Sequence, residues 1–214
     1  MTRVSFQGER GAYSEAASIS FFGNTIDTIP CTTFADALKN TENDVSDYSV
    51  LPVENSLEGS VGESNDLLVT VNLDAVGEIY HRIRHCLIGT GSLENIDTVY
   101  SHTQALGQCR KFIQENSLKT VPSYDTAGSV KIIKDLNKNN VACIASKNAA
   151  EIFGVPVIKQ GIEDNRNNYT RFLVLSKESN EDSLISKQNA SSNKKTSIIF
   201  SVKHEAGALY QIIK

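Results

Sequence analysis

Short apolar runs alternate with helical patterns along most of this chain, and this alternation constrains the fold more than any other feature. It is typical of α/β sheets whose parallel strands are joined by right-handed helical crossovers. Ser14 and Thr33 are predicted helix caps. The predicted strands are 3–7, 25–30, 48–53, 98–101, 120–124, 141–145, 156–159 and 171–175. The predicted helices are 14–22, 34–40, 64–71, 104–116, 127–136 and 147–153.

The pattern divides into two α/β units. One extends to about residue 76 and the other from there to about residue 160. The long extended stretch Val76–Thr90 suits a crossing between two lobes, and Arg171–Leu175 is a candidate for a return to the first lobe. A cleft is therefore expected between the units.

Residues 177–195 have a different composition, rich in Ser, Asn, Lys and acidic residues, with almost nothing apolar to bury. This composition predicts a linker. After it, a strand is predicted at TSIIFSV (196–202) and the start of a helix at GALYQII (207–213). One strand and part of a helix cannot form a core alone. We expect them to begin a second domain whose remainder is absent from this sequence.

Charge and composition argue against several classes of protein. The formal net charge is −4 and no run of five Lys or Arg occurs, so nucleic acid is not an expected partner. No apolar stretch approaches the roughly 18 residues of a membrane span, and the N-terminus lacks a signal-peptide pattern. We therefore expect a cytoplasmic protein. The four cysteines form no CxxC pair and are expected to be reduced, with Cys109 as a packing residue.

Four polar clusters fall at the ends of predicted strands. Three follow a strand, at Gly8–Ser14, Glu54–Ser56 and Ser101–Gln108, and the fourth, Asn167–Arg171, precedes the last strand. In α/β sheets, ligands gather beyond the carboxyl ends of strands, where helix N-termini present free N–H groups. The clusters therefore predict a site for a small, anionic, oxygen-rich ligand.

Each cluster also has a purely structural interpretation. Gly8 and Gly11 can be turn residues, because GERG is not the dinucleotide fingerprint GxGxxG. Asn55 and Ser56 can simply shape a loop, and Gln108 can be a solvated helix residue. From spacing alone, the sequence predicts a cleft enzyme or a binding protein for a small anion.

The histidines do not indicate a metal site. His81 and His85 are four residues apart in an apparently extended stretch, which places them about 13 Å apart, too far for one metal ion. His102 could serve as a base, but no paired Cys or Ser nucleophile signature accompanies it. No metal is expected.

Five motifs, in order and with matching spacing, resemble those of the prephenate dehydratase family, including its arogenate dehydratase branch. The resemblance covers roughly residues 3–176. The motifs are FQGERGAYSEAA (6–17), PVENSLEGSV (52–61), SHTQALGQC (101–109), ACIASKNAAEIFG (142–154) and Thr170-Arg171-Phe172.

The resemblance implies a periplasmic-binding-protein-like fold of two α/β lobes flanking a cleft. The catalytic domain is then expected at 1–177, with lobe one at about 1–76 and 165–177 and lobe two at about 77–164. A linker is expected at 178–195, followed at 196–214 by the start of a ferredoxin-like ACT regulatory domain.

The resemblance also implies a lyase that converts prephenate to phenylpyruvate with loss of water and carbon dioxide, without a cofactor, in phenylalanine biosynthesis. Its main catalytic residue is expected to be Thr170. The other expected catalytic positions are Asn55, Ser101 and Gln108. The expected substrate-binding residues are Arg171, Ser56, Gly11, Ser14 and Phe172. We expect Glu54 to face a structural partner.

GALYQII resembles the GALxxxL signature of phenylalanine-binding ACT domains. This implies an incomplete regulatory site at Gly207, Ala208 and Leu209, phenylalanine as the effector of a full-length protein, and a homodimer or homotetramer. Arogenate in place of prephenate is an open alternative. A non-catalytic sensor with the same fold is another, although it would not need the Thr170 triplet. A purely regulatory protein is disfavoured, because the catalytic motifs are complete.

Overall fold

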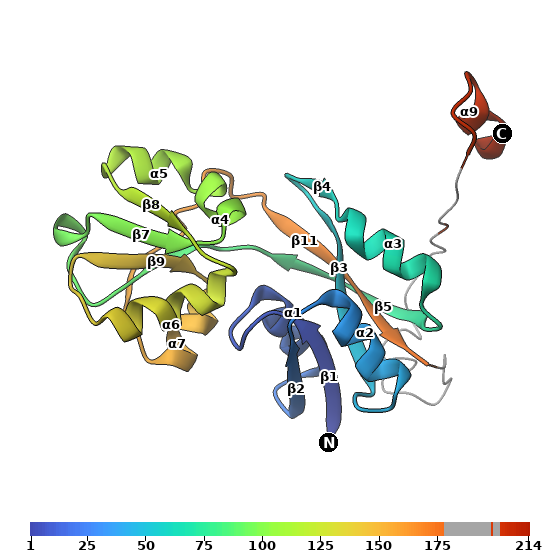
Figure 1. Ribbon diagram of the computed structural model, residues 1–214, viewed down its shortest axis with the longest axis horizontal. Helices are drawn as coiled ribbons and strands as arrows, with labels where there is room; N and C mark the ends of the chain where they lie inside the picture. The colour runs from blue at the N-terminus through green and yellow to red at the C-terminus, as the bar shows by residue number, and fades with distance from the viewer. Residues whose placement is uncertain (178–197, 199–201) are drawn as a thin grey trace.

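Two mixed sheets, each covered by helices on both faces, form two lobes that lie side by side in a computed structural model (Figure 1). The structure describes residues 1–177, 198 and 202–214. The strands are β1 (Thr2–Gln7), β2 (Ile26–Cys31), β3 (Tyr48–Asn55), β4 (Gly59–Ser60), β5 (Asp74–Arg82), β6 (Cys86–Ile88), β7 (Thr98–Ser101), β8 (Lys119–Pro122), β9 (Val141–Ala145), β10 (Val157–Gln160) and β11 (Tyr169–Ser176).

The helices match the predicted crossovers between these strands. They are α1 (Tyr13–Phe22), α2 (Phe34–Glu42), α3 (Gly62–Thr70), α4 (Thr103–Gln108), α5 (Arg110–Glu115), α6 (Thr126–Leu136), α7 (Lys147–Phe153) and α9 (Ala208–Ile213), with a short 3-10 turn at Leu93–Asn95. Of the two predicted caps, Thr33 is confirmed, since its Oγ1 accepts the Asp36 N–H at 3.0 Å. No helix in the described residues is both long enough and apolar enough to cross a membrane.

The first lobe is built on the sheet β2-β1-β3-β11-β5. Helix α1 covers one face over a cluster that includes Val4, Ala17 and Phe172. Helices α2 and α3 cover the other face over Leu38 and Leu51. Both faces of the sheet are buried, and the inner strands β3 and β11 accordingly contain nearly continuous apolar runs.

The second lobe is built on the sheet β10-β6-β9-β7-β8. Helices α4 and α5 cover one face, around Val99 and Phe112, and Cys109 is fully buried in this cluster, as its packing interpretation predicted. Helices α6 and α7 cover the other face, around Val130 and Ala149. The predicted two-lobed α/β architecture is confirmed.

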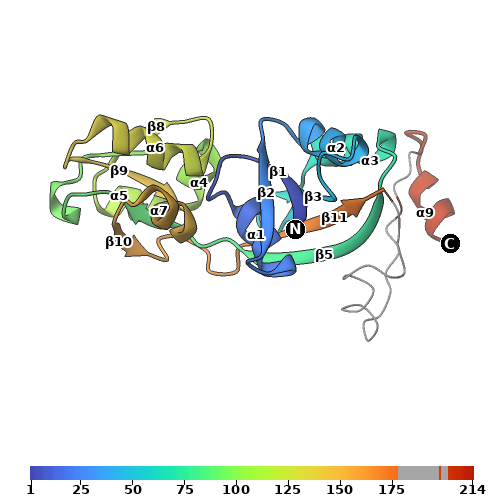
Figure 2. The same cartoon turned by 90° about the horizontal axis from the view of Figure 1, so that it is seen from below.

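The chain passes between the lobes twice, at residues 83–85 and at residues 161–168 (Figure 2). The stretch Val76–Thr90 becomes β5 in the first sheet and β6 in the second, so it does cross between them. β5 stays in the first sheet to Arg82, a few residues beyond the expected lobe change near 76. The two crossings bind each other, because Ile83 N donates to Asn168 O at 2.8 Å and Gly161 N to His85 O at 2.9 Å.

The expectation of parallel sheets holds for the pairing of β1 with β2 and β3 and of β7 with β8 and β9, but not for the rest of either sheet. β11 runs antiparallel to both β3 and β5, and β6 runs antiparallel to β9 and β10. The cause is the double crossing. β11 returns from the second lobe into the gap between β3 and β5, so its direction is set by the side from which it enters.

Two predicted helix boundaries also differ from the structure. Helix α1 begins at Tyr13 after Ala12, so Ser14 is not its cap but a buried residue of its first turn. The Glu15 carboxylate accepts the Gly11 N–H at 2.6 Å and takes over part of that role. The helix predicted at 104–116 is interrupted at Cys109, which leaves the helical region with ψ 23° and separates α4 from α5.

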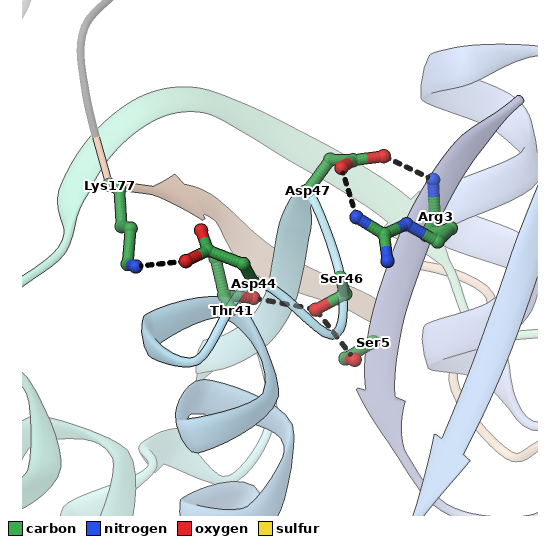
Figure 3. Close-up of polar contacts among 7 residues, drawn as sticks. All are labelled: Arg3, Ser5, Thr41, Asp44, Ser46, Asp47 and Lys177. Atoms are coloured by element: carbon green, nitrogen blue, oxygen red, sulfur yellow. Dashed lines mark hydrogen bonds and ion pairs between the residues drawn. The ribbon is translucent and has the colours of Figure 1, made fainter.

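Buried hydroxyls join β1 to the segment between α2 and β3 (Figure 3). Ser46 Oγ accepts from Ser5 Oγ at 2.8 Å and lies 2.9 Å from Thr41 Oγ1. Arg3 and Asp47 add an ion pair of 2.8 Å beside them. The three hydroxyls are buried and satisfy one another inside the lobe, whereas the Arg3–Asp47 pair is exposed at its surface.

The helix predicted at GALYQII is confirmed as α9, which follows Gly207. The linker expected at 178–195 lies outside the described residues, as does nearly all of the strand expected at 196–202.

Candidate active site

A cavity of about 580 Å³ lies between the lobes, lined by both of them and by the first crossing. Its walls combine apolar surface with many uncharged polar side chains and two carboxyl side chains, Glu63 and Asp125. The lining residues are Gln7, Gly8, Ala12, Tyr13, Ser14, Thr32, Thr33, Phe34, Pro52, Asn55, Val61, Glu63, Ile83, His85, His102, Gln104, Ala105, Gln108, Tyr124, Asp125, Thr126, Thr170 and Phe172.

Five of the residues expected in the site line this one cavity. The predicted convergence of strand-end clusters therefore occurs in space. Three of the five are the main expected catalytic groups, and the other two are expected substrate contacts. They are Asn55, Gln108 and Thr170, with Ser14 and Phe172.

Asn55 and Thr170 face each other across the central strand pair β3–β11, where they are register partners. The Asn55 side chain is 6% exposed, and its amide is held at both ends. Its Oδ1 accepts the N–H groups of Leu57 and Glu58 at 3.0 and 3.1 Å. Its Nδ2 donates to Thr170 Oγ1 at 3.0 Å and to Asn168 Oδ1 at 2.8 Å. Strand pairing therefore fixes the hydroxyl of Thr170.

Gln108 joins this group from the second lobe. Its Oε1 accepts from Asn168 Nδ2 at 2.9 Å and lies 2.8 Å from His85 Nε2. Its backbone carbonyl accepts the Asp164 N–H at 2.7 Å, which binds the end of α4 to the second crossing. The Gln108 amide is therefore fixed by the crossings rather than by its own helix.

Two of the expected site residues lie elsewhere. Ser101 is fully buried, and its Oγ donates to Ile144 O at 2.6 Å inside the second lobe. The Arg171 side chain pairs with Glu78 at 3.0 Å and with Glu54 at 3.7 Å. Arg171 lies between Thr170 and Phe172, which line the cavity, so strand alternation turns it to the other face of the sheet. The pairing with Arg171 agrees with the partner expected for Glu54.

Ser56 and Gly11 do not line the cavity but stabilise the segments that form its walls. Ser56 Oγ donates to Asn167 O and accepts from Tyr169 N, both at 2.9 Å, which fixes the start of β11. Gly11 has φ +89°, and a Cβ there would lie 2.5 Å from Ala149 Cα of the second lobe. Ser146 Oγ also donates to Gly11 O at 2.7 Å. Gly11 thus makes a close contact between the lobes.

Sequence reasoning missed three residues of the site: Tyr13, His85 and Asn168. The hydroxyl of Tyr13 lies 2.9 Å from His85 Nδ1. Asn168 is fully buried and joins Asn55 to Gln108. The signal for Asn168 was its place in the polar cluster before the last strand, and the signal for Tyr13 was its place beside Ser14. For His85, the sequence offers only its four-residue spacing from His81, which was tested as a metal-ligand pattern.

The lining of the cavity contains the acidic residues Glu63 and Asp125 but no Lys or Arg. Positive potential comes instead from helix N-termini. The first residues of α1, α2 and α6, which are Tyr13, Phe34 and Thr126, all line the cavity. Within the described residues, no group of three or more His, Cys, Asp or Glu side chains is placed to hold a metal ion.

Burial shifts the pKa of several lining groups, which include His85, Tyr13 and Asp125. It lowers the pKa of His85, an effect partly offset by the hydrogen bond to Gln108 and by the charge of Glu163. It raises the pKa of Tyr13 well above its ordinary value. It also raises the pKa of Asp125, partly offset by the N–H groups that this residue caps. Burial in the cavity wall therefore favours the uncharged forms of these three side chains.

Two α/β lobes around a shared polar cavity define a cleft protein for a small ligand. The chain belongs to the prephenate dehydratase family, whose model, described as "Prephenate dehydratase", matches residues 4–180. The family resemblance inferred from the motifs is thereby confirmed.

The most informative relatives share a large part of this chain. It is 39% identical over 99% of its length to "Arogenate dehydratase/prephenate dehydratase 2, chloroplastic" of Arabidopsis thaliana, covering 54% of that protein. A structure of prephenate dehydratase in complex with L-Phe from Arthrobacter aurescens superimposes with a TM-score of 0.75 and 28% identity, over 82% of this chain and 60% of that one. A structure of GqqA, described as a novel type of quorum quenching acylase, gives a TM-score of 0.78 and 28% identity, over 99% of this chain and 75% of that one. The chain thus spans about half the length of the curated relative.

Proposed function

We propose that this chain is a prephenate dehydratase, a lyase that releases water and carbon dioxide from prephenate to give phenylpyruvate in phenylalanine biosynthesis. The observation that carries the proposal is the convergence of Asn55, Gln108 and Thr170 on one cavity. Membership of the prephenate dehydratase family supports it.

The hydrogen bonds of Thr170 suit it as the donor to the leaving group. Its Oγ1 accepts from Asn55 Nδ2, so its own proton is not used in that bond and can point into the cavity. The donated hydrogen bond also stabilises negative charge that develops on Oγ1 as the proton moves away. A lone threonine hydroxyl is a weak acid, and Asn55 compensates for part of that weakness.

The reaction then proceeds by electron flow through the ring. The bond to the ring carboxylate breaks, carbon dioxide leaves, and its electron pair enters the ring. The ring hydroxyl departs from the opposite carbon with its bonding pair and leaves as water after accepting a proton. Hydroxide is a poor leaving group, so a prepositioned donor lowers the barrier. Aromatisation supplies the driving force, and the step requires no cofactor.

Binding of a dianion is assigned to neutral donors and helix N-termini. Helices α1, α2 and α6 begin at the cavity, and Ser14 adds a hydroxyl there, whereas the Thr33 hydroxyl already donates to Asp36 Oδ2 at 2.7 Å. Each helix N-terminus stabilises a nearby negative charge by roughly 0.3–1 kcal/mol, and by more where it is partly buried. These contributions take the place of the arginine that the sequence analysis assigned to substrate binding.

Arogenate is the second candidate substrate, and one observation favours it. Arogenate carries an ammonium group where prephenate carries a keto group. The cavity is lined by the carboxyl side chains of Glu63 and Asp125 but by no Lys or Arg. The relative named for both activities is consistent with either substrate.

The test is to mix the purified chain with prephenate or with arogenate and to follow phenylpyruvate and phenylalanine separately. Product from prephenate, with a smaller kcat/KM for arogenate, is the expected result. The reverse ranking would make the chain an arogenate dehydratase. Recovery of both ligands unchanged, despite binding, would identify a sensor and contradict the proposal.

The proposal also covers regulation and assembly. Helix α9 and Gly207 are consistent with the start of an ACT domain in which Gly207, Ala208 and Leu209 contribute to a phenylalanine site. A homodimer or homotetramer and a cytoplasmic location remain predictions of the sequence. The Arabidopsis relative is named as chloroplastic.

A further inference from the structure

A continuous row of side-chain amides leads from the last residue of β3 to His85. Asn55, Asn168 and Gln108 contact one another in that order, and Gln108 Oε1 lies 2.8 Å from His85 Nε2. Asn168 is fully buried and His85 is 2% exposed, whereas Gln108 is partly buried and lines the cavity. The row draws on the first lobe, the second lobe and both crossings.

Backbone donors fix the direction of every bond in this row. An amide can be reversed only if its neighbours allow it. The N–H groups of Leu57 and Glu58 require an acceptor, so the near atom of Asn55 is Oδ1 and its far atom is the donor Nδ2. Asn168 must then present its oxygen to Asn55 and its nitrogen to Gln108. Gln108 in turn must present its oxygen.

The final bond therefore decides which nitrogen of His85 carries a proton. Gln108 Oε1 is an acceptor, so Nε2 of His85 must be the donor, whatever the charge of the ring. The remaining amide nitrogen of Gln108 faces Glu58 Oε1 at 3.4 Å, an acceptor, which agrees with this orientation. Protonation of the ring can change only Nδ1.

Nδ1 faces Tyr13, and the groups around the ring determine what happens there. The Tyr13 hydroxyl lies 2.9 Å from Nδ1 and also 2.9 Å from Arg84 O. The Glu163 carboxylate accepts the backbone N–H of His85 at 3.0 Å. The next residue, Cys86 at the start of β6, has a buried thiol. When the ring is neutral, Nδ1 accepts from Tyr13. When it is charged, Nδ1 donates to Tyr13 and the hydroxyl turns to Arg84 O.

We propose that His85 is a positioning residue: the backbone donors set the direction of the row, and His85, as an obligatory Nε2–H donor, holds its Gln108 end in place, so that Asn168 and Asn55 keep the geometry that leaves the Thr170 proton free for the substrate. The catalytic part of this statement rests on the proposed function. The tautomer part does not, because the bond directions follow from the geometry alone. His85 touches the reacting group only through the three amides.

The first experiment measures the tautomer directly in the 214-residue chain. Nitrogen NMR of histidine-labelled protein, with His85 assigned by comparison with His85→Gln, distinguishes a protonated ring nitrogen from an unprotonated one. We expect Nε2 to stay protonated through a pH titration while Nδ1 alone changes. A neutral ring with the proton on Nδ1 would overturn the proposal, even if the chain proved to have no dehydratase activity.

The second experiment uses two substitutions that divide the functions of the ring. In His85→Gln the amide nitrogen can take the place of Nε2 and keep the bond to Gln108. In His85→Asn the shorter amide can reach only the position of Nδ1, towards Tyr13. We expect kcat to fall at least about 10-fold further in His85→Asn than in His85→Gln, with little difference in KM.

Equal losses of kcat in the two variants would show that His85 acts only by packing, and would contradict the proposal. His81→Asn serves as a matched control. Its ring also contacts Tyr13, at 6.4 Å between centroids, but it forms no part of the amide row. It is expected to leave the NMR signature of His85 unchanged.

Discussion

The two lobes place their polar residues at the cavity in different ways. In the first lobe, Asn55 and Thr170 are neighbours because β3 and β11 pair in register, so the sheet itself sets their contact. In the second lobe, the matching strand end is occupied by Ser101, whose hydroxyl is used inside the core by Ile144 O. Gln108, on α4, reaches the site instead. The chemistry is therefore fixed by strands on one side and by a helix with its crossings on the other.

Replacing Thr170 by Ala tests the first lobe and should give the largest effect. Loss of a prepositioned donor should lower kcat about 10²–10³-fold while substrate still binds. Steady-state kinetics with prephenate and arogenate measure this change. Thr170→Ser keeps the hydroxyl and is the matched control. Near-normal turnover in Thr170→Ala would remove this residue from the mechanism.

Gly11→Ala tests the close contact between the lobes at Gly11. The new Cβ would lie 2.5 Å from Ala149 Cα, at φ +89°, where an L-residue is strained. We expect the free energy of unfolding to fall by about 1–3 kcal/mol, measured by urea denaturation. Gly23→Ala is the control, since it has a similar φ of +85° but no atom within 4 Å of its Cβ. Equal losses in the two variants would mean that backbone strain, rather than lobe contact, causes the effect.

Ser101→Ala tests whether the second lobe contributes its strand end to the chemistry. Ser101 Oγ donates to a buried carbonyl, so its removal should cost about 1 kcal/mol of stability. We expect a much smaller loss of kcat than in Thr170→Ala. A loss as large as that of Thr170→Ala, in a protein of normal stability, would support the catalytic role that the family resemblance assigns to Ser101.

Acidification should weaken the fold through His81, in β5, and His85, in the first crossing. Burial lowers the pKa of both rings below the ordinary value of about 6.5. As the pH falls through about 6.5, the unfolded chain binds protons that the folded chain does not, so the free energy of unfolding decreases. Urea midpoints measured at several pH values should show a shallower slope for His81→Asn than for the wild type. Identical slopes would refute a contribution from His81.

Arg171→Gln should have the smallest effect. The Arg171 side chain is 24% exposed and pairs with Glu54 and Glu78 away from the cavity. The free energy of unfolding should therefore fall by less than about 1 kcal/mol. Thermal unfolding and KM together check this expectation. An unchanged KM would agree with the placement of Arg171 outside the cavity. A large rise in KM would restore it as a substrate contact.

Much of the fold was predictable because strand–helix alternation is a local property of the sequence. The direction of β11 was not, since it depends on the side from which the chain returns after the second crossing. The same limit applied to the site. Asn55 and Thr170 were found as strand-end residues. The buried hydrogen bond of Ser101 was not predictable from the pattern, because its partner, Ile144 O, lies 43 residues away in the sequence.

The two crossings carry His85 and Asn168, so the segments that connect the lobes also carry two of the four side chains in the hydrogen-bonded row. A hinge rotation that widened the entrance for ligand exchange would bend these segments and break the row. Ligand access and alignment of Thr170 would then be mutually exclusive states of one movement. With such a movement, product release would coincide with a pause in proton donation, and the donor would be aligned only while the ligand is enclosed.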